Sequence, residues 1–342
     1  MSGIAVETFH SIHDIDPQLW DALSGHLPFQ SYRWYEFGET VMSDCEPVYL
    51  LFFDGDQLIA RASFWVIRNE PLPKMSQILQ RLVEAAMRRW PLFVCRSPLS
   101  NSSGLVMQSE TVSPEIYARL QTVAIEEARR VHASFVLVDY LIEKDILAWH
   151  GDTITLKMPS PGTVLVNQWR SLDEFLADGN KKDRQHYKRS LREADKLGIR
   201  LTPHKSVQDI NKALELIHIV EERYGSTPNP WTQGMLEHLH MVDGTWLAAQ
   251  IDDQLVGCGL MLEDQGVQLT TALGLAADIP YVYFRLVYAS LETALTRQVR
   301  LLRWGTGAYE VKRRLGFEME KNNYSILMGT NRLTDWLARR VA

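Results

Sequence analysis

The amino-acid sequence predicts an α+β protein of two tandem lobes, each a twisted, mostly antiparallel sheet flanked by helices. Three observations lead to this prediction: a hairpin pattern occurs twice, a helix–strand pattern occurs twice, and both keep the same order in each half. The length of 342 residues also fits two domains. We expect an N-terminal lobe over 1–160 and a C-terminal lobe over 161–342, divided near Pro159 and Pro161.

The repeated hairpin covers residues 49–65 (YLLFFDGDQLIARASFW) and residues 246–262 (WLAAQIDDQLVGCGLML). The two segments align without a gap at an offset of 197 residues. In each, an apolar run meets a polar turn containing Asp-Gln-Leu, and a second β-rich run follows. This order is typical of a β-hairpin.

The second repeat joins residues 117–138 to residues 283–304, at an offset of 166 residues. Both segments begin Tyr-x-Arg-Leu, continue as an amphipathic helix and end in a short buried strand. The first half therefore has about 31 additional residues between hairpin and helix, where segment 75–90 predicts an extra amphipathic helix. The alternative is chance similarity between two common hairpin–helix–strand units.

The rest of the second half predicts the following elements, in chain order: a strand at 163–169, a short helix opened by the capping-box spacing of 171–174, helices at 181–197, 207–223 and 231–241, strands at 245–251, 255–263 and 267–275, a helix at 281–297, strands at 299–304 and near 323–329, and a C-terminal helix.

Composition limits the function classes. The formal net charge of −6 argues against a surface devoted wholly to nucleic acid, although it is compatible with a local basic site. The cysteines are isolated and odd in number, so we expect reduced, buried thiols and no metal site. No signal peptide is apparent, and no apolar run approaches the ~18 residues that span a bilayer. We therefore expect a cytoplasmic protein.

Segment 304–317, WGTGAYEVKRRLGF, resembles the corresponding segment of FemAB-like tandem-GNAT acyltransferases. Segments 161–176 and 181–199, together with FQSYRWYEF (29–37) and CRSPLSNSSGLVM (95–107), resemble other landmarks of that family. The resemblance implies two GNAT-like (N-acetyltransferase-like) lobes and transfer of an acyl or aminoacyl group to an amine or similar nucleophile. The family includes aminoacyl-tRNA-dependent enzymes that build peptidoglycan bridges.

Acyl transfer to an amine needs an oriented amine and a positive group where the carbonyl oxygen becomes negative. Lys312, after the turn Gly305-Thr306-Gly307, is the first candidate, since the resemblance implies that it contacts the acyl or phosphate end of the donor. Its alternative role is that of a surface lysine in a basic run. Tyr309 is a candidate hydrogen-bond partner of the leaving group, or else a packing residue.

Two carboxylates near strand ends are candidates for orienting or deprotonating the acceptor amine. These are Glu310 and Asp139, and the alternative for each is a surface charge. Asp139 corresponds to Gly305 in the repeat, so we expect it at the equivalent end of the first sheet.

The donor is predicted from a basic stripe and from an unusual loop. Arg184, Lys188 and Arg192 recur at helical spacing and suit tRNA phosphates, with a solvated helix face as the alternative. Thr306 and Gly307 are further donor-binding candidates. The loop at 275–280 has no glycine or arginine and contains an aspartate, which disfavours the usual binding of the CoA pyrophosphate before a helix.

We therefore expect aminoacyl-tRNA as donor, with no cofactor, and a small molecule or cell-wall precursor bearing an amine, hydroxylamine or hydroxyl as acceptor. An acyl-CoA-dependent N-acyltransferase and a catalytically silent binding protein are the alternatives. The predicted helix at 75–90 is expected to pack on the first lobe, with contact to a membrane surface as the less favoured alternative.

Overall fold

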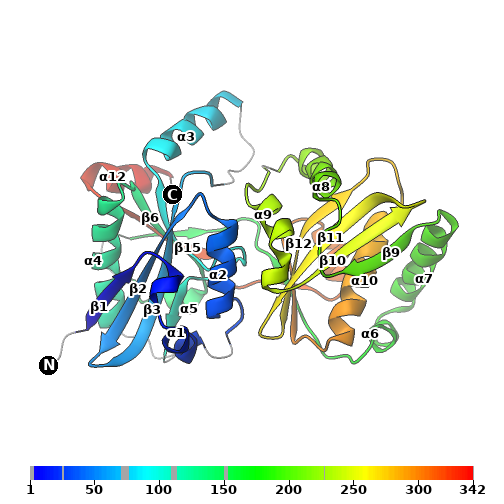
Figure 1. Ribbon diagram of the computed structural model, residues 1–342, viewed down its shortest axis with the longest axis horizontal. Helices are drawn as coiled ribbons and strands as arrows, with labels where there is room; N and C mark the ends of the chain where they lie inside the picture. Colours follow the sequence, from blue (N-terminus) through cyan, green and yellow to red (C-terminus); the bar gives the residue numbers. More distant parts are fainter. Residues whose placement is uncertain are drawn as a thin grey trace. The chain divides into compact units, whose positions relative to one another are not determined.

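The computed structural model describes residues 4–24, 27–70, 77–108, 114–149, 153–226 and 228–341. Within them the chain divides into two units, Gly162–Glu320 and a first unit that joins Met1–Pro161 to Lys321–Ala342 (Figure 1). Each unit is built on one mixed, mostly antiparallel sheet covered by helices, which confirms the α+β prediction of two similar lobes.

The described residues of the first unit form an eight-stranded sheet in the order β1-β2-β3-β4-β6-β15-β7, with β5 beside β3. Its strands are β1 (Ala5–Phe9), β2 (Glu46–Asp54), β3 (Gln57–Ile67), β4 (Leu92–Cys95), β5 (Leu105–Met107), β6 (Phe135–Leu141), β7 (Ile154–Lys157) and β15 (Tyr324–Gly329). Its helices are α1 (Pro17–Ser24), α2 (Tyr32–Val41), α3 (Gln77–Arg89), α4 (Pro114–Arg130), α5 (Glu143–Ile146) and α12 (Arg332–Val341).

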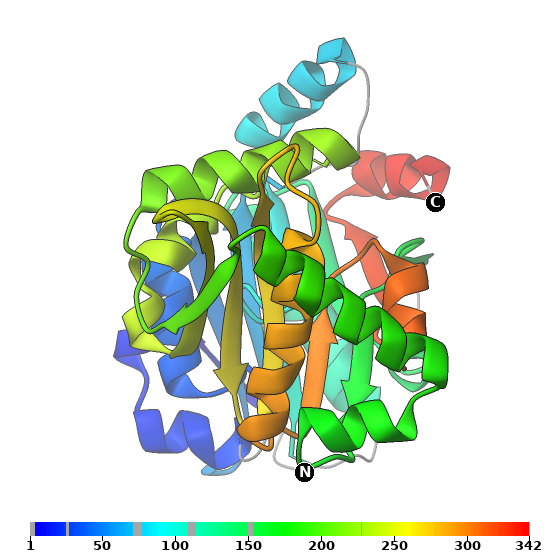
Figure 2. The same ribbon diagram turned by 90° about the vertical axis from the view of Figure 1, so that its right-hand side faces the viewer.

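The described residues of the second unit form a seven-stranded sheet in the order β14-β8-β13-β12-β11-β10-β9. Its strands are β8 (Thr163–Val166), β9 (Arg200–His204), β10 (Asp243–Ile251), β11 (Gln254–Asp264), β12 (Val267–Leu275), β13 (Leu301–Trp304) and β14 (Glu318–Met319). Its helices are α6 (Leu172–Asp178), α7 (Lys181–Lys196), α8 (Ile210–Tyr224), α9 (Thr232–Glu237), α10 (Val282–Thr296) and α11 (Tyr309–Arg314). Figure 2 shows α7 and α10 together in front of this sheet.

The internal repeat is confirmed at the level of single residues. Hairpin β10–β11 begins and ends 197 residues after hairpin β2–β3, and both carry a register shift at the same place, after Phe52 and after Ala249. Strands β6 and β13 begin 166 residues apart, each after a helix that matches the second repeat. The additional segment of the first half contains α3 and β5, so the extra helix predicted there is confirmed.

The prediction of a contiguous C-terminal lobe over 161–342 is wrong for residues 321–342, which belong to the first unit. Strand β15, predicted near 323–329, forms but pairs with β6 and β7 of the first sheet, and the second unit ends at Glu320. Ile326 and Met328 are buried in the first core. Burial of these apolar side chains favours the return of the chain to the first sheet.

Other differences are local. The helix predicted at 207–223 begins at Ile210, because the Asp209 side chain caps the N–H of Lys212. The helix predicted at 231–241 divides into α9 and a short 3₁₀ turn at Leu239–Met241. Strand β9 was not predicted, since Arg200–His204 has no apolar run and contains Pro203, which is tolerated at a sheet edge.

Candidate active site

Two parallel strands of the second unit end at different points along the sheet. Strands β12 and β13 pair from Val267–Leu301 to Thr270–Trp304, and then β12 continues to Leu275 while β13 ends. The residue after β13 is Gly305, where an added Cβ would meet no atom within 4 Å. The strand end is therefore bordered by open space.

Lys312 lies directly beside this strand end. It is 6% exposed, on the short helix α11, and its Nζ donates to the carbonyl oxygens of Gly305 at 2.5 Å and Thr306 at 3.3 Å. Burial lowers the pKa of the Lys312 ammonium to about 8, and the carboxylate of Glu320 opposes this shift. The lysine is thus a buried cation whose proton is lost near pH 8.

The turn before Lys312 holds a sharply bent backbone. Gly307 and Ala308 have φ values of 82° and 46°, in the left-handed region that favours glycine. Thr306 and Gly307 are exposed, and an added Cβ at Gly307 would meet no atom within 4 Å. The two predicted donor-binding residues therefore lie beside Lys312 on an accessible turn.

Two further candidates belong to the same helix. The Nζ of Lys312 lies 5.8 Å from the centroid of the half-buried Tyr309 ring. Glu310 is exposed in the first turn of α11. The structure thus brings Lys312, Tyr309, Thr306 and Gly307 together, with Glu310 at the rim.

A buried ion pair that the sequence analysis missed supports this turn. The Nε of Arg303 lies 2.5 Å from Oε1 of Glu320, and its Nη2 lies 3.1 Å from Oε2. A bidentate pair of this kind holds both side chains in one orientation. The pair joins Arg303 on β13 to Glu320, which follows β14. Because the two residues are far apart in the sequence, no local sequence pattern predicts their contact.

Asp139 lies at the equivalent position of the first unit, but in a different environment. Strands β4 and β6 also pair in parallel, from Leu92–Phe135 to Cys95–Val138, and the next residues are Arg96 and Asp139. The Arg96 guanidinium contacts Asp139 at 2.6 Å and Glu70 at 2.8 Å, and Ser325 donates to Asp139 at 2.7 Å. An ion-pair cluster thus fills the strand end that is open in the second unit.

This cluster is electrostatically stable. Burial disfavours the charge on Arg96, but the carboxylates of Glu70 and Asp139 outweigh that effect and raise its pKa above the ordinary value. Both Asp139 oxygens have hydrogen-bond donors, so its geometry favours a structural role. It also belongs to the first unit, whereas Lys312 belongs to the second.

The predicted basic stripe lies on α7, with its three members in different environments. Arg184 donates to the carbonyls of Leu176, Ala177 and Gly179 at the end of α6. Arg192 is exposed and paired with Glu193 at 3.2 Å, and Lys188 is exposed. The exposed cations of this helix are Lys181, Lys182, Lys188, Arg189, Arg192 and Lys196.

The loop before α10 has two features that bear on the donor. The Ala277 carbonyl accepts from Arg223 at 2.9 Å, and Asp278 is exposed. Tyr281, the residue before the helix, adopts φ 68° and makes no side-chain capping hydrogen bond. An uncapped helix N-terminus favours anions, whereas the adjacent aspartate disfavours them.

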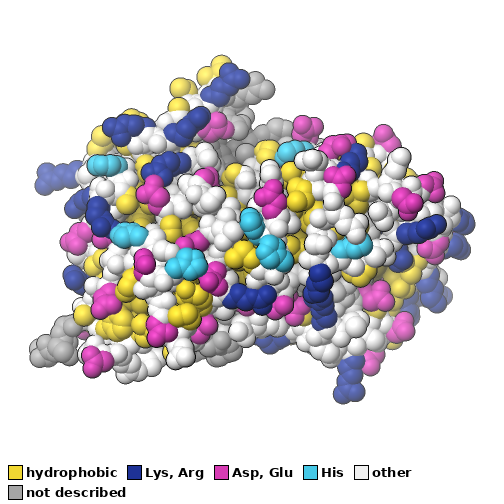
Figure 3. All heavy atoms as spheres, in the orientation of Figure 1, with side chains coloured by type: hydrophobic (Ala, Val, Ile, Leu, Met, Phe, Trp, Pro, Cys, Tyr) yellow, Lys and Arg dark blue, Asp and Glu magenta, His cyan; other side chains and the backbone are white. Residues whose placement is uncertain are grey.

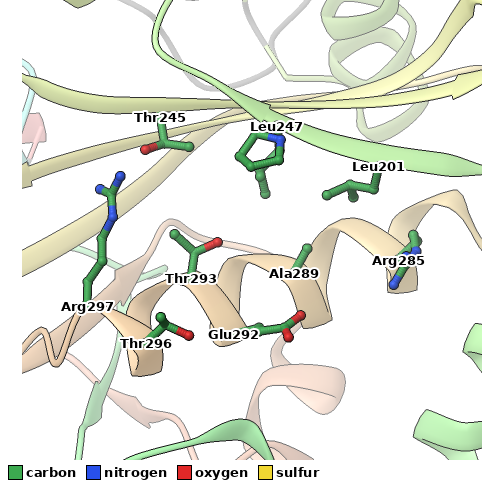
Figure 4. Close-up of a pocket in the computed structure, with 10 residues that line it drawn as sticks. Leu201, Thr245, Leu247, Arg285, Ala289, Glu292, Thr293, Thr296 and Arg297 are labelled. Atoms are coloured by element: carbon green, nitrogen blue, oxygen red, sulfur yellow. The ribbon is translucent and has the colours of Figure 1, made fainter.

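A groove of about 430 Å³ lies elsewhere in the second unit, between α10 and strands β9 and β10 (Figure 4). In Figure 4, Arg285 and Arg297 lie toward opposite ends of the groove along α10. The hydroxyl of Thr245 and the Nε of Arg285 are buried without a partner among the described residues, whereas Arg297 pairs with Glu263 at 3.2 Å. The groove offers hydrogen-bond donors, but its lining residues do not include those of the Lys312 turn.

Cys45, Cys95 and Cys258 are buried free thiols, as predicted. Over the described ranges, no cluster of histidine, cysteine and carboxylate side chains is suited to hold a metal ion. No helix in this part of the chain has the length and apolar character to cross a bilayer.

Comparison with known proteins identifies one family. The FemAB-like family, described as peptidoglycan biosynthesis/recognition, matches residues 11–339. No curated protein sequence matches significantly.

Solved structures are similar in fold. The crystal structure of FemX has a TM-score of 0.59 at 11% identity, covering 94% of this chain and 96% of that one. A tandem GNAT protein from the clavulanic acid biosynthesis pathway has a TM-score of 0.55 at 13% identity, covering 96% and 99%. The C-terminal domain of a putative lysylphosphatidylglycerol synthetase from Agrobacterium fabrum has a TM-score of 0.53 at 10% identity, covering 96% of each chain. At such identities the similarity shows two GNAT-like lobes and no more.

Proposed function

The chain belongs to the FemAB-like family of tandem GNAT proteins, and we propose that it transfers an aminoacyl group from aminoacyl-tRNA to an amine, hydroxylamine or hydroxyl. The family and fold make it an acyl- or aminoacyltransferase. The observation that carries the proposed site is Lys312, a buried cation beside an open strand end. We propose a small molecule or a peptidoglycan precursor as acceptor, in line with the description of the family.

The proposed chemistry needs no protein nucleophile. The acceptor nitrogen forms a bond to the donor carbonyl carbon, the ester C–O bond to the terminal ribose breaks, and one proton passes from nitrogen to ribose oxygen. The Lys312 ammonium would stabilise the negative carbonyl oxygen, since a cation in a desolvated site interacts strongly with developing charge. Tyr309 would donate a hydrogen bond to the leaving oxygen, and Glu310 at the rim would orient the acceptor.

The difference between the units supports the second unit as the catalytic one. The residues after the last parallel pair are Arg96 and Asp139 in the first unit, but Thr271 and Gly305 in the second. The small residues Thr271 and Gly305 leave space for a donor at the strand ends of the second unit. In the first unit the buried ion pair of Arg96 and Asp139 occupies the equivalent space. Asp139 is accordingly not part of the proposed mechanism.

Two features support tRNA as donor. Exposed cations follow one another along α7, although Arg184 is engaged at the end of α6 and Arg192 with Glu193. The aspartate in the loop before α10 disfavours a pyrophosphate there. A cytoplasmic location, where charged tRNA is available, remains a prediction.

Acyl-CoA is the second candidate donor, and a specific observation favours it. Helix α10 follows β12 with no side-chain cap at Tyr281, so its first N–H groups are suited to bind phosphate. The competing aspartate, Asp278, makes this the weaker candidate.

The two donors are distinguished by a binding measurement followed by turnover. A ligand at 100 times its dissociation constant stabilises the folded state by roughly 2.7 kcal/mol, which a thermal-shift titration with acetyl-CoA detects. We expect no shift with acetyl-CoA, and anisotropy-detected binding of charged tRNA that weakens steeply with salt. Saturable stabilisation by acetyl-CoA would instead make the chain an acyl-CoA enzyme.

Turnover is then measured as release of labelled amino acid from charged tRNA to hydroxylamine as a probe amine, corrected for the uncatalysed reaction. We expect Lys312→Met to lower the enzyme-dependent rate by about a hundredfold or more, and Arg313→Met, an exposed neighbour on α11, to retain it. Equal rates for Lys312→Met and wild type would remove the proposed site.

A further inference from the structure

Two helices of the first unit present apolar side chains to solvent. On α3 and the residue that follows it, Ile78 is 76% exposed, Leu82 is 63% exposed and Trp90 is 54% exposed. The expectation that the helix at 75–90 packs on the first lobe is therefore wrong for Ile78 and Leu82. Met87 is buried at 6% exposure, while Met75 lies outside the described residues.

The C-terminal helix α12 has the same character. Leu333 is 65% exposed, Trp336 is 50% exposed and Leu337 is 39% exposed, while Thr334 and Ala338 on the opposite face are buried. Figures 1 and 2 both show α3 and α12 at the upper end of the first unit. We name the exposed apolar residues of these helices, with the arginines between them, the α3–α12 surface.

Arginines alternate with the apolar side chains on the α3–α12 surface, and Figure 3 shows both kinds intermixed over α3. The six arginines are Arg81, Arg88, Arg89, Arg332, Arg339 and Arg340. The same segments contain two carboxylates, Glu84 and Asp335, and Asp335 accepts from the N–H of Gly329. The local charge is thus positive in a chain whose net charge is −6.

Each tryptophan has an arginine beside its ring. The guanidinium carbon of Arg340 lies 4.3 Å from the centroid of Trp336, and that of Arg89 lies 5.9 Å from Trp90. Tryptophan favours the boundary between lipid headgroups and acyl chains, and arginine at the same depth contacts anionic headgroups. The excess of arginine over carboxylate on these two helices is complementary to a negatively charged lipid surface.

From this combination we propose that the α3–α12 surface docks the first unit on an anionic lipid surface. Leu82, Trp90, Leu333 and Trp336 enter the interfacial region, and the arginines bind lipid phosphates. Each arginine near an anionic surface strengthens partitioning by roughly fivefold. This docking is independent of the acyl donor.

Vesicle flotation tests the proposal on the full-length chain. The protein is mixed with vesicles of phosphatidylcholine alone, or of equal parts phosphatidylcholine and phosphatidylglycerol, at low and high salt. We expect flotation with the anionic vesicles, weakened by salt, and little with phosphatidylcholine alone. Absence of flotation with anionic vesicles at low salt would overturn the proposal.

Three variants on the surface separate its parts: Leu333→Ala with Trp336→Ala, Arg339→Glu with Arg340→Glu, and Ile78→Ser with Leu82→Ser. All these side chains are exposed, so we expect unchanged melting temperatures and partitioning lowered by roughly tenfold or more. The matched control is Leu147→Ala with Arg119→Glu, exposed residues elsewhere on the first unit, and we expect it to bind as wild type.

Two outcomes would contradict the proposal even if wild type floats. If all three variants floated as well as wild type, lipid binding would belong to another surface. A concentration-dependent dimer in light scattering that these variants abolish, without any effect on flotation, would make the α3–α12 surface an interface between copies.

Discussion

Lys312 combines a charge with burial, and this combination predicts how its protonation depends on pH. The folded chain loses the Lys312 proton near pH 8, whereas an unfolded lysine keeps it to about 10.5. Between these values unfolding takes up a proton, so the lysine makes the free energy of unfolding rise with pH. If the ammonium stabilises the oxyanion, kcat falls above about pH 8.

Lys312→Met tests both consequences. We expect turnover to fall by about a hundredfold or more, whereas stability at pH 7 is retained because the buried charge is removed. Urea unfolding at pH 7 and pH 10 should show a smaller rise in the free energy of unfolding with pH for the variant than for wild type. A kcat that rises through pH 8 in wild type would instead assign the neutral amine as a base.

Asp139 was expected to orient or deprotonate the acceptor amine, but it lies in a buried ion pair with Arg96. Asp139→Ala leaves the buried Arg96 without its contact at 2.6 Å, so we expect a loss of about 3 kcal/mol in the free energy of unfolding. Arg96→Met combined with Asp139→Leu removes both charges, and we expect it to be less destabilising. A variant of Asp139 that keeps its stability and loses turnover per folded molecule would restore a catalytic role.

At the scale of elements, helix α7 combines an observed contact with α6 and the proposed binding of tRNA. Arg184 binds the last carbonyls of α6, so Arg184→Ala should lower stability by about 1 to 2 kcal/mol. Lys188→Glu with Arg189→Glu changes exposed side chains, so we expect unchanged stability, weaker tRNA binding and a flatter dependence on salt. Urea unfolding and anisotropy titrations across salt separate the two effects, and an unchanged salt slope would exclude α7 from tRNA binding.

At the scale of the whole molecule, the return of β15 makes the first unit depend on the end of the chain. Removal of residues 321–342 deletes the strand between β6 and β7, and with it the buried Ile326 and Met328. We expect hydrogen exchange to show lost protection in β6 and β7 and retained protection in β10–β12, because two core side chains alone contribute several kcal/mol. Removal of α12 alone, residues 332–342, is the control, and unchanged protection of β6 after the longer truncation would contradict this dependence.

The sequence by itself determined the doubled architecture, because hairpins and amphipathic helices are local patterns whose periodicity survives in both halves. Strands β2, β3, β10 and β11 agree with the predicted repeat, and α7 agrees with the helix predicted at 181–197. The turn before Lys312 was likewise found from its own residues and their resemblance to a family.

Only the tertiary structure decided what depends on contacts between distant segments. The assignment of β15 to the first sheet, the ion pair of Arg96 and Asp139, and the engagement of Arg184 at α6 have no local signature. The lowered pKa of Lys312 belongs to the same class, since it arises from desolvation by the surrounding fold. Local periodicity reports which element forms, whereas strand partners and buried charges are set by the burial free energy of the assembled unit.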